Sequence, residues 1–339
     1  MKERIIESFD GNKICCYLWD NVKNPVGVVQ IFHGMAEHAT RYDEFAKFLN
    51  KNGYIVFADD HRGHGKTAGS VQNIGQYEGG NIFFDTAQDE KYFAKLLKEE
   101  YNLPIYLFGH SYGSFIALHF IQTCNLYEKV VLSGSSYMKR QDAKFAHLVS
   151  KITKKFKGEK APAKLVEKLS FVSYNKKFHD NGSWLNSDKE KTQEYYSDPQ
   201  CGLSFSAKFY DDLFSAFNII FKNENLYKID DNKKILILSG KEDPVSKMGK
   251  LVIKLYRVFK EHDLRVAMKL YAGARHEIIH DTTKETVFQD VLDFFNGKAV
   301  DAVGLAIKKK KELRAKRVAE QISSQNTNTT KKPSKSKSK

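Results

Sequence analysis

The chain has 339 residues, of which 41% are hydrophobic and 28% charged, so it is long and apolar enough to bury a substantial core. Its net charge of +14 lies mainly at the end, because residues 299–339 contain 12 Lys or Arg against 3 Asp or Glu. The body is therefore only mildly basic, which speaks against a nucleic-acid partner. No run approaches the roughly 18 continuous apolar residues of a membrane span, and residues 1–4 precede a polar strand rather than a signal-peptide core, so we expect a cytoplasmic protein.

Residues 1–134 alternate short apolar runs with stretches of helical periodicity. Strands are expected at residues 28–32, 54–58, 105–108 and 130–132, with helices near residues 42–49 and through residues 92–97. This alternation is typical of a mostly parallel central sheet flanked by helices. We therefore predict an α/β fold whose first part spans residues 1–134.

The alternation stops in residues 135–229, which are rich in Lys and scattered aromatic residues and contain no clean strand. We interpret this segment as a helical cap, or lid, inserted between two strands. Apolar runs resume after it, and they predict strands and helices at residues 235–238, 252–259, 266–271 and 287–295. Residues 230–298 are thus the second part of the core.

Four cysteines, Cys15, Cys16, Cys124 and Cys201, show no C-x-x-C spacing. The adjacent pair would face opposite sides of a strand, because side chains alternate along it. We expect reduced thiols that serve in packing.

The motif Gly109-His110-Ser111-Tyr112-Gly113 follows the expected strand at residues 105–108. It has the pattern of a nucleophile elbow, a sharp strand-to-helix turn that exposes a serine between glycines that leave room for nearby backbone. Apolar residues after it have the periodicity of a buried helix. The order of strand, turn and helix predicts a serine hydrolase with Ser111 as its nucleophile.

A serine hydroxyl needs a base to remove its proton and a carboxylate to orient that base. In a doubly wound hydrolase sheet these partners follow the serine in the order acid then histidine, each just past a late strand. Asp243 and His276 occupy such positions. Asp243 stands before a proline and has the alternative role of a turn former, and the neighbouring Glu242 is a second candidate for the acid.

A zinc site is the main competing interpretation of His276, because residues 276–280 match the H-E-x-x-H pattern with Glu277 and His280. That pattern requires a helix, whereas an expected strand and Gly273 come directly before it. We therefore favour the triad and expect no metal. The pairs His33 and His38, and His61 and His64, have no further ligand at a known metal-site spacing, so we interpret them as structural.

An acyl-transfer site also needs hydrogen-bond donors for the developing oxyanion. The sequence offers the backbone N–H of Tyr112, which follows the nucleophile, and the N–H of Met35, which follows the strand at residues 28–32. Gly34 allows the loop that carries Met35 to approach closely.

These motifs together resemble the monoacylglycerol lipase and lysophospholipase branch of the α/β-hydrolases, which is also grouped with serine aminopeptidase-like hydrolases. The resemblance covers nearly the whole body and rests on residues 33–38 with 41–42, and on residues 60–65, 109–113, 243–246 and 275–277. It implies a triad of Ser111, Asp243 and His276, an oxyanion hole from Met35 and Tyr112, and a cap over an acyl pocket. Two departures bear on the substrate: Tyr112 stands where methionine is frequent, and Thr67 where serine is frequent.

We expect a carboxylic ester hydrolase that acts on a small lipid ester through an acyl-enzyme, without a metal or organic cofactor. A peptidase or thioesterase on the same scaffold is the alternative, since a triad alone does not choose among acyl groups, and a non-catalytic binding module is a third interpretation. The basic tail at residues 299–339 suits an anionic membrane surface, and its end is expected to be disordered because it is mostly Ser, Thr, Asn and Lys.

Overall fold

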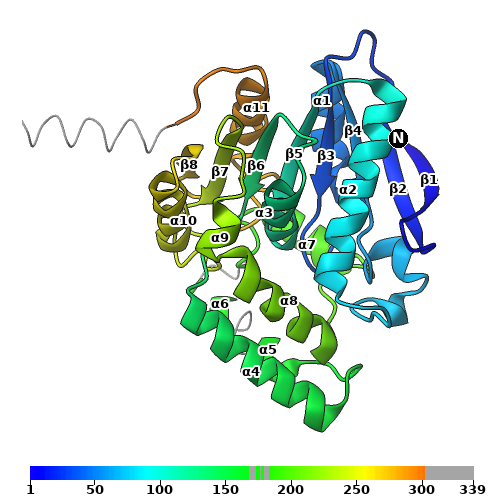
Figure 1. The fold of residues 1–339 in the computed structure, drawn as a ribbon, viewed down its shortest axis with the longest axis vertical. Coiled ribbons are helices and arrows are strands. Elements are labelled where there is room, and N and C mark those ends of the chain that lie inside the picture. Colours follow the sequence, from blue (N-terminus) through cyan, green and yellow to red (C-terminus); the bar gives the residue numbers. More distant parts are fainter. Residues whose placement is uncertain (168–172, 176, 179–182, 302–339) are drawn as a thin grey trace, which may run out of the picture.

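The computed structural model describes residues 1–167, 173–175, 177–178 and 183–301 (Figure 1). Its centre is an eight-stranded sheet in the order β1-β2-β4-β3-β5-β6-β7-β8. The strands are β1 Lys2–Glu7, β2 Lys13–Trp19, β3 Gly27–Phe32, β4 Tyr54–Asp59, β5 Ile105–His110, β6 Lys129–Ser133, β7 Lys234–Gly240 and β8 Arg265–Tyr271. β1 and β2 pair antiparallel at one edge, and the six strands from β4 to β8 run parallel, so the predicted mostly parallel sheet is confirmed.

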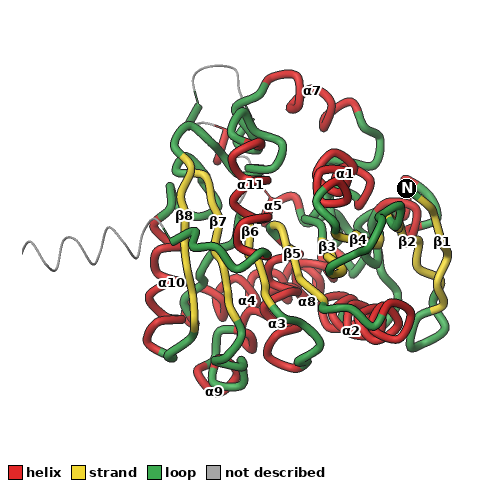
Figure 2. The backbone as a smooth tube through the Cα atoms, turned by 90° about the horizontal axis from the view of Figure 1, so that it is seen from above, coloured by secondary structure: helices red, strands yellow, loops and turns green. Residues whose placement is uncertain are grey.

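Helices cover both faces of this sheet (Figure 2). On one face α1 (Asp43–Lys51) and α11 (Lys284–Phe295) pack on alternate strand residues such as Val29, Phe108 and Leu236. On the other face α2 (Ile82–Tyr101), α3 (Tyr112–Thr123) and α10 (Lys250–Glu261) pack on the residues between them, including Leu107 and Ile235. Strands buried on both sides in this way explain the continuous apolar runs in the sequence.

The chain leaves the sheet after β6 and returns at β7. Between them lie α4 (Arg140–Lys157), α5 (Lys164–Glu167), α6 (Ser173–Asn175), α7 (Lys189–Ser197), α8 (Ala207–Ile220) and α9 (Asn223–Leu226). These helices occupy the stretch that we predicted as the cap. In Figure 1 α4 and α8 lie side by side beyond the carboxyl ends of the strands, and α4 is the outer of the two.

The four cysteines are free thiols, and Cys15 and Cys16 lie on opposite faces of β2, as the sequence predicted. Within the described residues, no helix has both the length and the apolar character that crossing a membrane requires. The basic tail lies outside the described residues from position 302 onward.

Candidate active site

Ser111 occupies the sharp turn between β5 and α3 that the sequence predicted. Its backbone has φ of +50° and ψ of −116°, a conformation that is rare for a residue with a side chain. The flanking glycines explain how the turn fits. A Cβ on Gly109 would lie 2.5 Å from the carbonyl oxygen of Gly113, and a Cβ on Gly113 would collide with the carbonyl of Phe32 on β3.

His276 and Asp243 lie beside this serine, on loops that follow β8 and β7. The Nε2 atom of His276 is 2.9 Å from Ser111 Oγ, and its Nδ1 atom is 3.1 Å from Asp243 Oδ1. Asp243 is completely buried, and its Oδ1 also accepts a hydrogen bond from the N–H of Val245 at 2.8 Å. Glu242, the alternative acid, is exposed. The structure therefore brings together the hydroxyl, imidazole and carboxylate that the sequence singled out.

The surroundings of His276 decide how readily it takes a proton. Burial disfavours the charged imidazolium, but the Asp243 carboxylate outweighs this and raises the pKa of His276 above its ordinary value. His110 lies beside it, with ring centroids 5.0 Å apart, and burial lowers the pKa of His110 to about 3. His276 therefore accepts a proton more readily than an ordinary histidine, whereas His110 stays neutral.

Two backbone N–H groups are available beside Ser111. Tyr112 is the first residue of α3, so its N–H has no carbonyl partner within the helix. The N–H of Met35 has no hydrogen-bond acceptor among the described residues. The next residue, Ala36, is held by the cap, because its carbonyl accepts hydrogen bonds from Tyr195 Oη and from the N–H of Gly202, both at 2.9 Å.

Ser111 and Met35 line two cavities. The first, of about 260 Å³, is also lined by His276, Trp184 and Glu167, and we call it the His276-side cavity. The second, of about 510 Å³, is here called the α8-side cavity. Its apolar lining comes from α3, α8, the start of α10 and the loops around them, and includes Phe115, Met138, Leu213, Phe214, Phe217 and Leu251.

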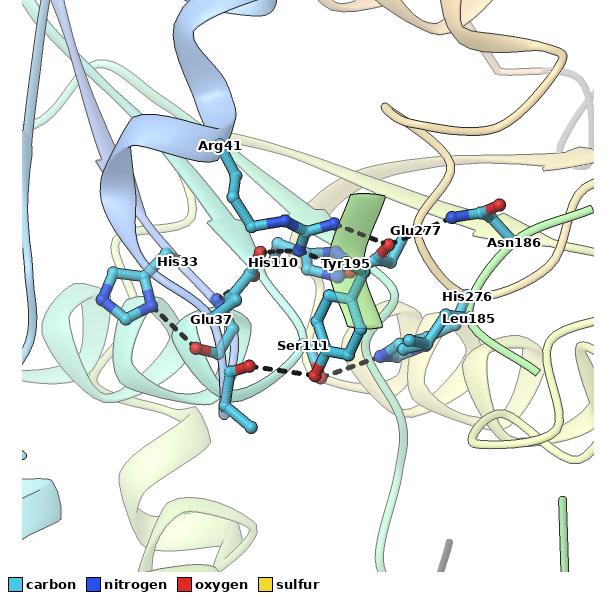
Figure 3. Close-up of polar contacts among 12 residues, drawn as sticks. His33, Glu37, Arg41, His110, Ser111, Leu185, Asn186, Tyr195, His276 and Glu277 are labelled. Atoms are coloured by element: carbon cyan, nitrogen blue, oxygen red, sulfur yellow. Dashed lines mark hydrogen bonds and ion pairs between the residues drawn. The ribbon is translucent and has the colours of Figure 1, made fainter. Parts of the chain in front are cut away.

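A buried charge network ties the loop of Met35 to the loop of His276 (Figure 3). Arg41 binds both oxygens of Glu277 at 2.6 and 2.9 Å and also forms an ion pair with Glu37. Glu37 in turn accepts hydrogen bonds from the N–H of Gly34 at 2.5 Å and from Tyr42 Oη at 2.9 Å. Burial opposes the charge of Glu277, but Arg41 outweighs burial and keeps the pKa of Glu277 well below its ordinary value.

This network also decides the zinc interpretation of residues 276–280. The segment forms turns rather than a helix, so His276 and His280 do not share a helical face. Glu277 is bound to Arg41, and Asn186 of the cap donates a further hydrogen bond to it at 3.2 Å. The glutamate is a structural ion-pair partner and not a general base.

The remaining loop histidines have structural contacts. His33 stacks on His61 at 3.9 Å between ring centroids and accepts a hydrogen bond from its N–H at 2.9 Å. His38 pairs with Asp198 of the cap at 2.8 Å. Within the part of the chain that the structure describes, two groups have ligand atoms close enough to hold a metal ion, namely His38 with Asp198 and Cys201, and Asp59 with His61 and Glu90. Neither group includes Ser111 or His276.

Comparison with known proteins adds independent evidence. Residues 23–283 match the model of the family described as serine aminopeptidase, S33. The chain belongs to the serine aminopeptidase S33 family. A monoglyceride lipase homolog of Monkeypox virus is 27% identical over 298 residues, which cover 86% of this chain and 97% of the viral protein. The monoacylglycerol lipase of Mycolicibacterium smegmatis is 25% identical over 283 residues, or 83% of this chain and 92% of its own length.

Solved structures give the same result. A carboxyl esterase from Bacillus coagulans has a TM-score of 0.80 and 28% identity, over 88% of this chain and 99% of the esterase. A monoglyceride lipase from Saccharomyces cerevisiae, with a TM-score of 0.68 and 23% identity over 89% of this chain and 97% of its own, shares the fold. The predicted α/β-hydrolase fold and the class of carboxylic ester hydrolase are confirmed for this S33 family member.

The sequence pattern did not reveal how Arg41 and Glu277 act on the site. Glu37 and Arg41 were noted only as parts of a family motif, and Glu277 only as part of such a motif and of the zinc pattern. The spacing of four between Glu37 and Arg41 is a signal for a local ion pair. Trp184 was also missed as a site residue, although its ring centroid lies 5.1 Å from that of His276.

Proposed function

We propose that Ser111, His276 and Asp243 form a catalytic triad that hydrolyses the ester bond of a monoacylglycerol. The observation that carries this proposal is the contact of His276 with both partners, at 2.9 Å to Ser111 Oγ and 3.1 Å to Asp243 Oδ1, where two cavities meet. Family membership supports the reaction class.

The reaction proceeds in two halves. His276 Nε2 takes the proton of Ser111 as Oγ attacks the ester carbonyl, and the amides of Met35 and Tyr112 stabilise the oxyanion. The tetrahedral intermediate then collapses: the bond to the alcohol oxygen breaks, and His276 returns the proton to the leaving glycerol. Water, activated by His276, next attacks the acyl-enzyme and releases the fatty acid, which restores Ser111.

The cavities support this substrate by their linings. The α8-side cavity offers apolar side chains for a long acyl chain. The His276-side cavity is lined by the carboxylates of Glu37, Glu167 and Glu277 and, among the described residues, by no Lys or Arg. Arg41, behind this lining, offsets one of the three negative charges, so the cavity keeps a net negative charge. A phosphate would be repelled there, whereas the hydroxyls of a glycerol find acceptors. We therefore favour a monoacylglycerol over a lysophospholipid, and the names of the relatives point the same way.

Labelling with a fluorophosphonate probe tests the proposed nucleophile. Wild type should be labelled and Ser111→Ala should not, while Ser114→Ala, one turn along α3, should keep the label as a matched control. No labelling of a folded wild-type protein would refute the mechanism and favour the binding-module interpretation.

A substrate panel then tests the acyl acceptor. Monoacylglycerol should be cleaved with a higher kcat/KM than lysophosphatidic acid with the same acyl chain, because only the second carries a charged phosphate into the His276-side cavity. A thioester and a peptide amide complete the panel. Preference for either would replace the ester proposal with the thioesterase or peptidase alternative.

A further inference from the structure

Three side chains with metal-binding atoms meet where the cap touches the core loop that carries Met35. His38 comes from that loop, and Asp198 and Cys201 come from the cap segment that follows α7. One ligand atom of each lies within 4.8 Å of the other two. The side chains of His38 and Cys201 are buried, and that of Asp198 is half-buried. We call these three residues the His38 cluster, and the proposed hydrolysis makes no use of them.

A tight turn presents both cap residues to His38. The N–H of Cys201 donates to the carbonyl of Asp198 at 3.1 Å, so the two side chains belong to one turn, three residues apart. Asp198 Oδ1 accepts the N–H of Gln200 at 2.8 Å, while Oδ2 lies 2.8 Å from His38 Nε2. The N–H of Gly202 donates to the core loop at 2.9 Å. The turn is therefore fixed both within itself and against the core.

The imidazole of His38 is held on its other side by Thr40, whose Oγ1 lies 2.9 Å from Nδ1. Without a metal ion, the proton on Nε2 is donated to Asp198, and Nδ1 accepts the hydroxyl of Thr40. With an ion on Nε2, the proton resides on Nδ1 and is donated to Thr40. Histidines that bind metals usually have such a second partner, because it fixes the tautomer and the orientation of the ring.

The thiol of Cys201 is buried, and its Sγ makes no hydrogen bond within the described part of the chain. Burial raises the pKa of this thiol, although the guanidinium of Arg41 lowers it. The carboxylates of Asp198, Glu37 and Glu277 raise it further. Cys201 is therefore an uncharged thiol at neutral pH, and an ion that binds Sγ has to displace its proton.

The donor set of the His38 cluster matches zinc, which binds imidazole nitrogen, thiolate sulfur and carboxylate oxygen, whereas calcium and magnesium prefer oxygen alone. Tetrahedral bonds of about 2.0–2.3 Å place ligand atoms roughly 3.3–3.6 Å apart, so His38 and Asp198 would separate by only about 0.5 Å. The thiolate and Asp198 neutralise a divalent ion. The neighbouring network adds two carboxylates and one guanidinium, so its net charge also favours a cation.

We propose that His38, Asp198 and Cys201 bind Zn²⁺ or a similar divalent ion, with water as the fourth ligand, and that this ion fastens the cap to the loop of Met35. The bond from Sγ to the ion forms as the S–H bond breaks, and the proton passes to solvent without any transfer of electrons. Hydrolysis of the ester does not need the ion. The proposal therefore goes beyond the proposed function and does not rest on it.

Co²⁺ reports a thiolate ligand directly. Titration of the full-length protein, kept reduced with a phosphine, should produce a sulfur-to-cobalt charge-transfer band in the near ultraviolet. Zn²⁺ should remove this band, because it binds such sites more tightly than Co²⁺. Calorimetric titration with Zn²⁺ in buffers of different ionisation enthalpy should show the release of about one proton per ion. Absence of the band, or binding without proton release, would overturn the proposal.

Substitutions then locate the ion. Cys201→Ser should abolish the cobalt band, whereas Cys124→Ser, a half-buried cysteine outside the His38 cluster, should keep it. His38→Gln and Asp198→Asn should weaken Co²⁺ binding by at least roughly tenfold, the smaller loss that follows removal of a mere partner of a ligand. Thermal unfolding without metal shows whether each variant is folded. His38→Gln tests the core side of the site even where Cys201→Ser does not fold, and unchanged affinity in it would overturn the proposal.

Hydrogen exchange tests the connection between cap and core. Zn²⁺ should slow amide exchange in residues 34–41 and 195–203 and leave residues 2–19 of β1 and β2 unchanged. It should also raise Tm by about 4 °C at a free concentration of about 100 times Kd. Protection confined to residues 276–280, or to the surroundings of Asp59, His61 and Glu90, would place the ion elsewhere and overturn the proposal.

The inactive variant Ser111→Ala separates this proposal from the proposed function. It should bind Co²⁺ with the same band and affinity as wild type, because Ser111 is not part of the His38 cluster. A wild-type protein that shows the band but cleaves no ester would refute the proposed function alone. A wild-type protein that cleaves the ester but never shows the band would refute the metal site alone.

Discussion

Replacing Arg41 by methionine should both destabilise the protein and slow catalysis. The guanidinium is the counter-ion of two buried carboxylates, Glu37 and Glu277, and makes two hydrogen bonds to the second. Methionine keeps much of the volume but leaves both charges without a counter-ion. Removing one partner from a buried ion pair costs about 3–5 kcal/mol of unfolding free energy. The expected fall in Tm is about 5–8 °C, because an unfolding entropy of about 2.1 cal/mol/K per residue gives roughly 1.6 °C per kcal/mol for about 300 folded residues.

The catalytic rate of Arg41→Met should fall because two loops of the site lose their shared anchor. Glu37 binds the loop of Met35, and Glu277 is adjacent to His276, so Arg41 fixes the distance between the proposed oxyanion donors and the proposed base. A displacement of about 1 Å at such a site lowers the rate by roughly 100-fold. We expect kcat to fall by about 10- to 100-fold with a smaller change in KM. Arg41→Lys keeps the charge but loses the bidentate geometry. Its stability and kcat should therefore lie between those of wild type and Arg41→Met.

The loss of stability in Arg41→Met should depend on pH. Arg41 keeps the pKa of Glu277 below its unfolded value, so this stabilisation is present above pH of about 4.3 and is lost as the pH falls through the lower folded pKa. The difference in unfolding free energy between wild type and Arg41→Met should therefore be full at pH 7 and shrink below about pH 4. Denaturant unfolding at several pH values measures it.

A double-mutant cycle tests whether Arg41 and Glu277 stabilise the protein as a pair. Adding Glu277→Gln to Arg41→Met should cost far less than Glu277→Gln costs in wild type, because the carboxylate has already lost its counter-ion. Additive costs would show that the two side chains do not act as a pair. An Arg41→Met protein within about 1 kcal/mol of wild type, with unchanged kcat, would refute the whole argument.

Three further outcomes are expected. Asp243→Asn should lower kcat by about 10⁴-fold, and the acid limb of its pH–rate profile should move to lower pH, because the carboxylate that raises the pKa of His276 is lost; an unmoved limb would contradict this. Gly113→Ala should destabilise the protein by at least about 2 kcal/mol in denaturant unfolding, since the new Cβ collides with the Phe32 carbonyl. Gly273→Ala adds a Cβ in open space, so only its positive φ of +78° opposes the substitution and it should cost less. Incubation with EDTA should leave ester hydrolysis unchanged, and a loss restored by zinc would revive the metal interpretation of His276.

Local patterns in the sequence were sufficient to locate the six parallel strands and the residues around the serine, but not the strand order or the antiparallel pair β1 and β2. Strand and helix periods can be read from neighbouring residues, because burial repeats every two or every 3.6 positions. Gly109 and Gly113 mark the elbow for a similarly local reason, since only a residue without a Cβ fits so close to other backbone. Asp243 and His276 could be chosen because parallel strands end at one edge, so loops after late strands meet.

Contacts between distant segments were decided only by the tertiary structure. Arg41 and Glu277 are 236 positions apart, and no local pattern shows that they share a charge network. The H-E-x-x-H pattern at residues 276–280 would need a helix to bind zinc, and the strand and Gly273 before it already spoke against one. The structure adds the reason, because β8 and the ion pair to Arg41 hold this segment in turns. Helix α4 is the same kind of case: its sequence has an apolar face, but only the packing of α8 and Asp211 on the other side leaves Phe145 and Phe156 of that face in solvent. The period of apolar residues along a helix or strand determines which side chains share a face. The surrounding fold determines what covers that face.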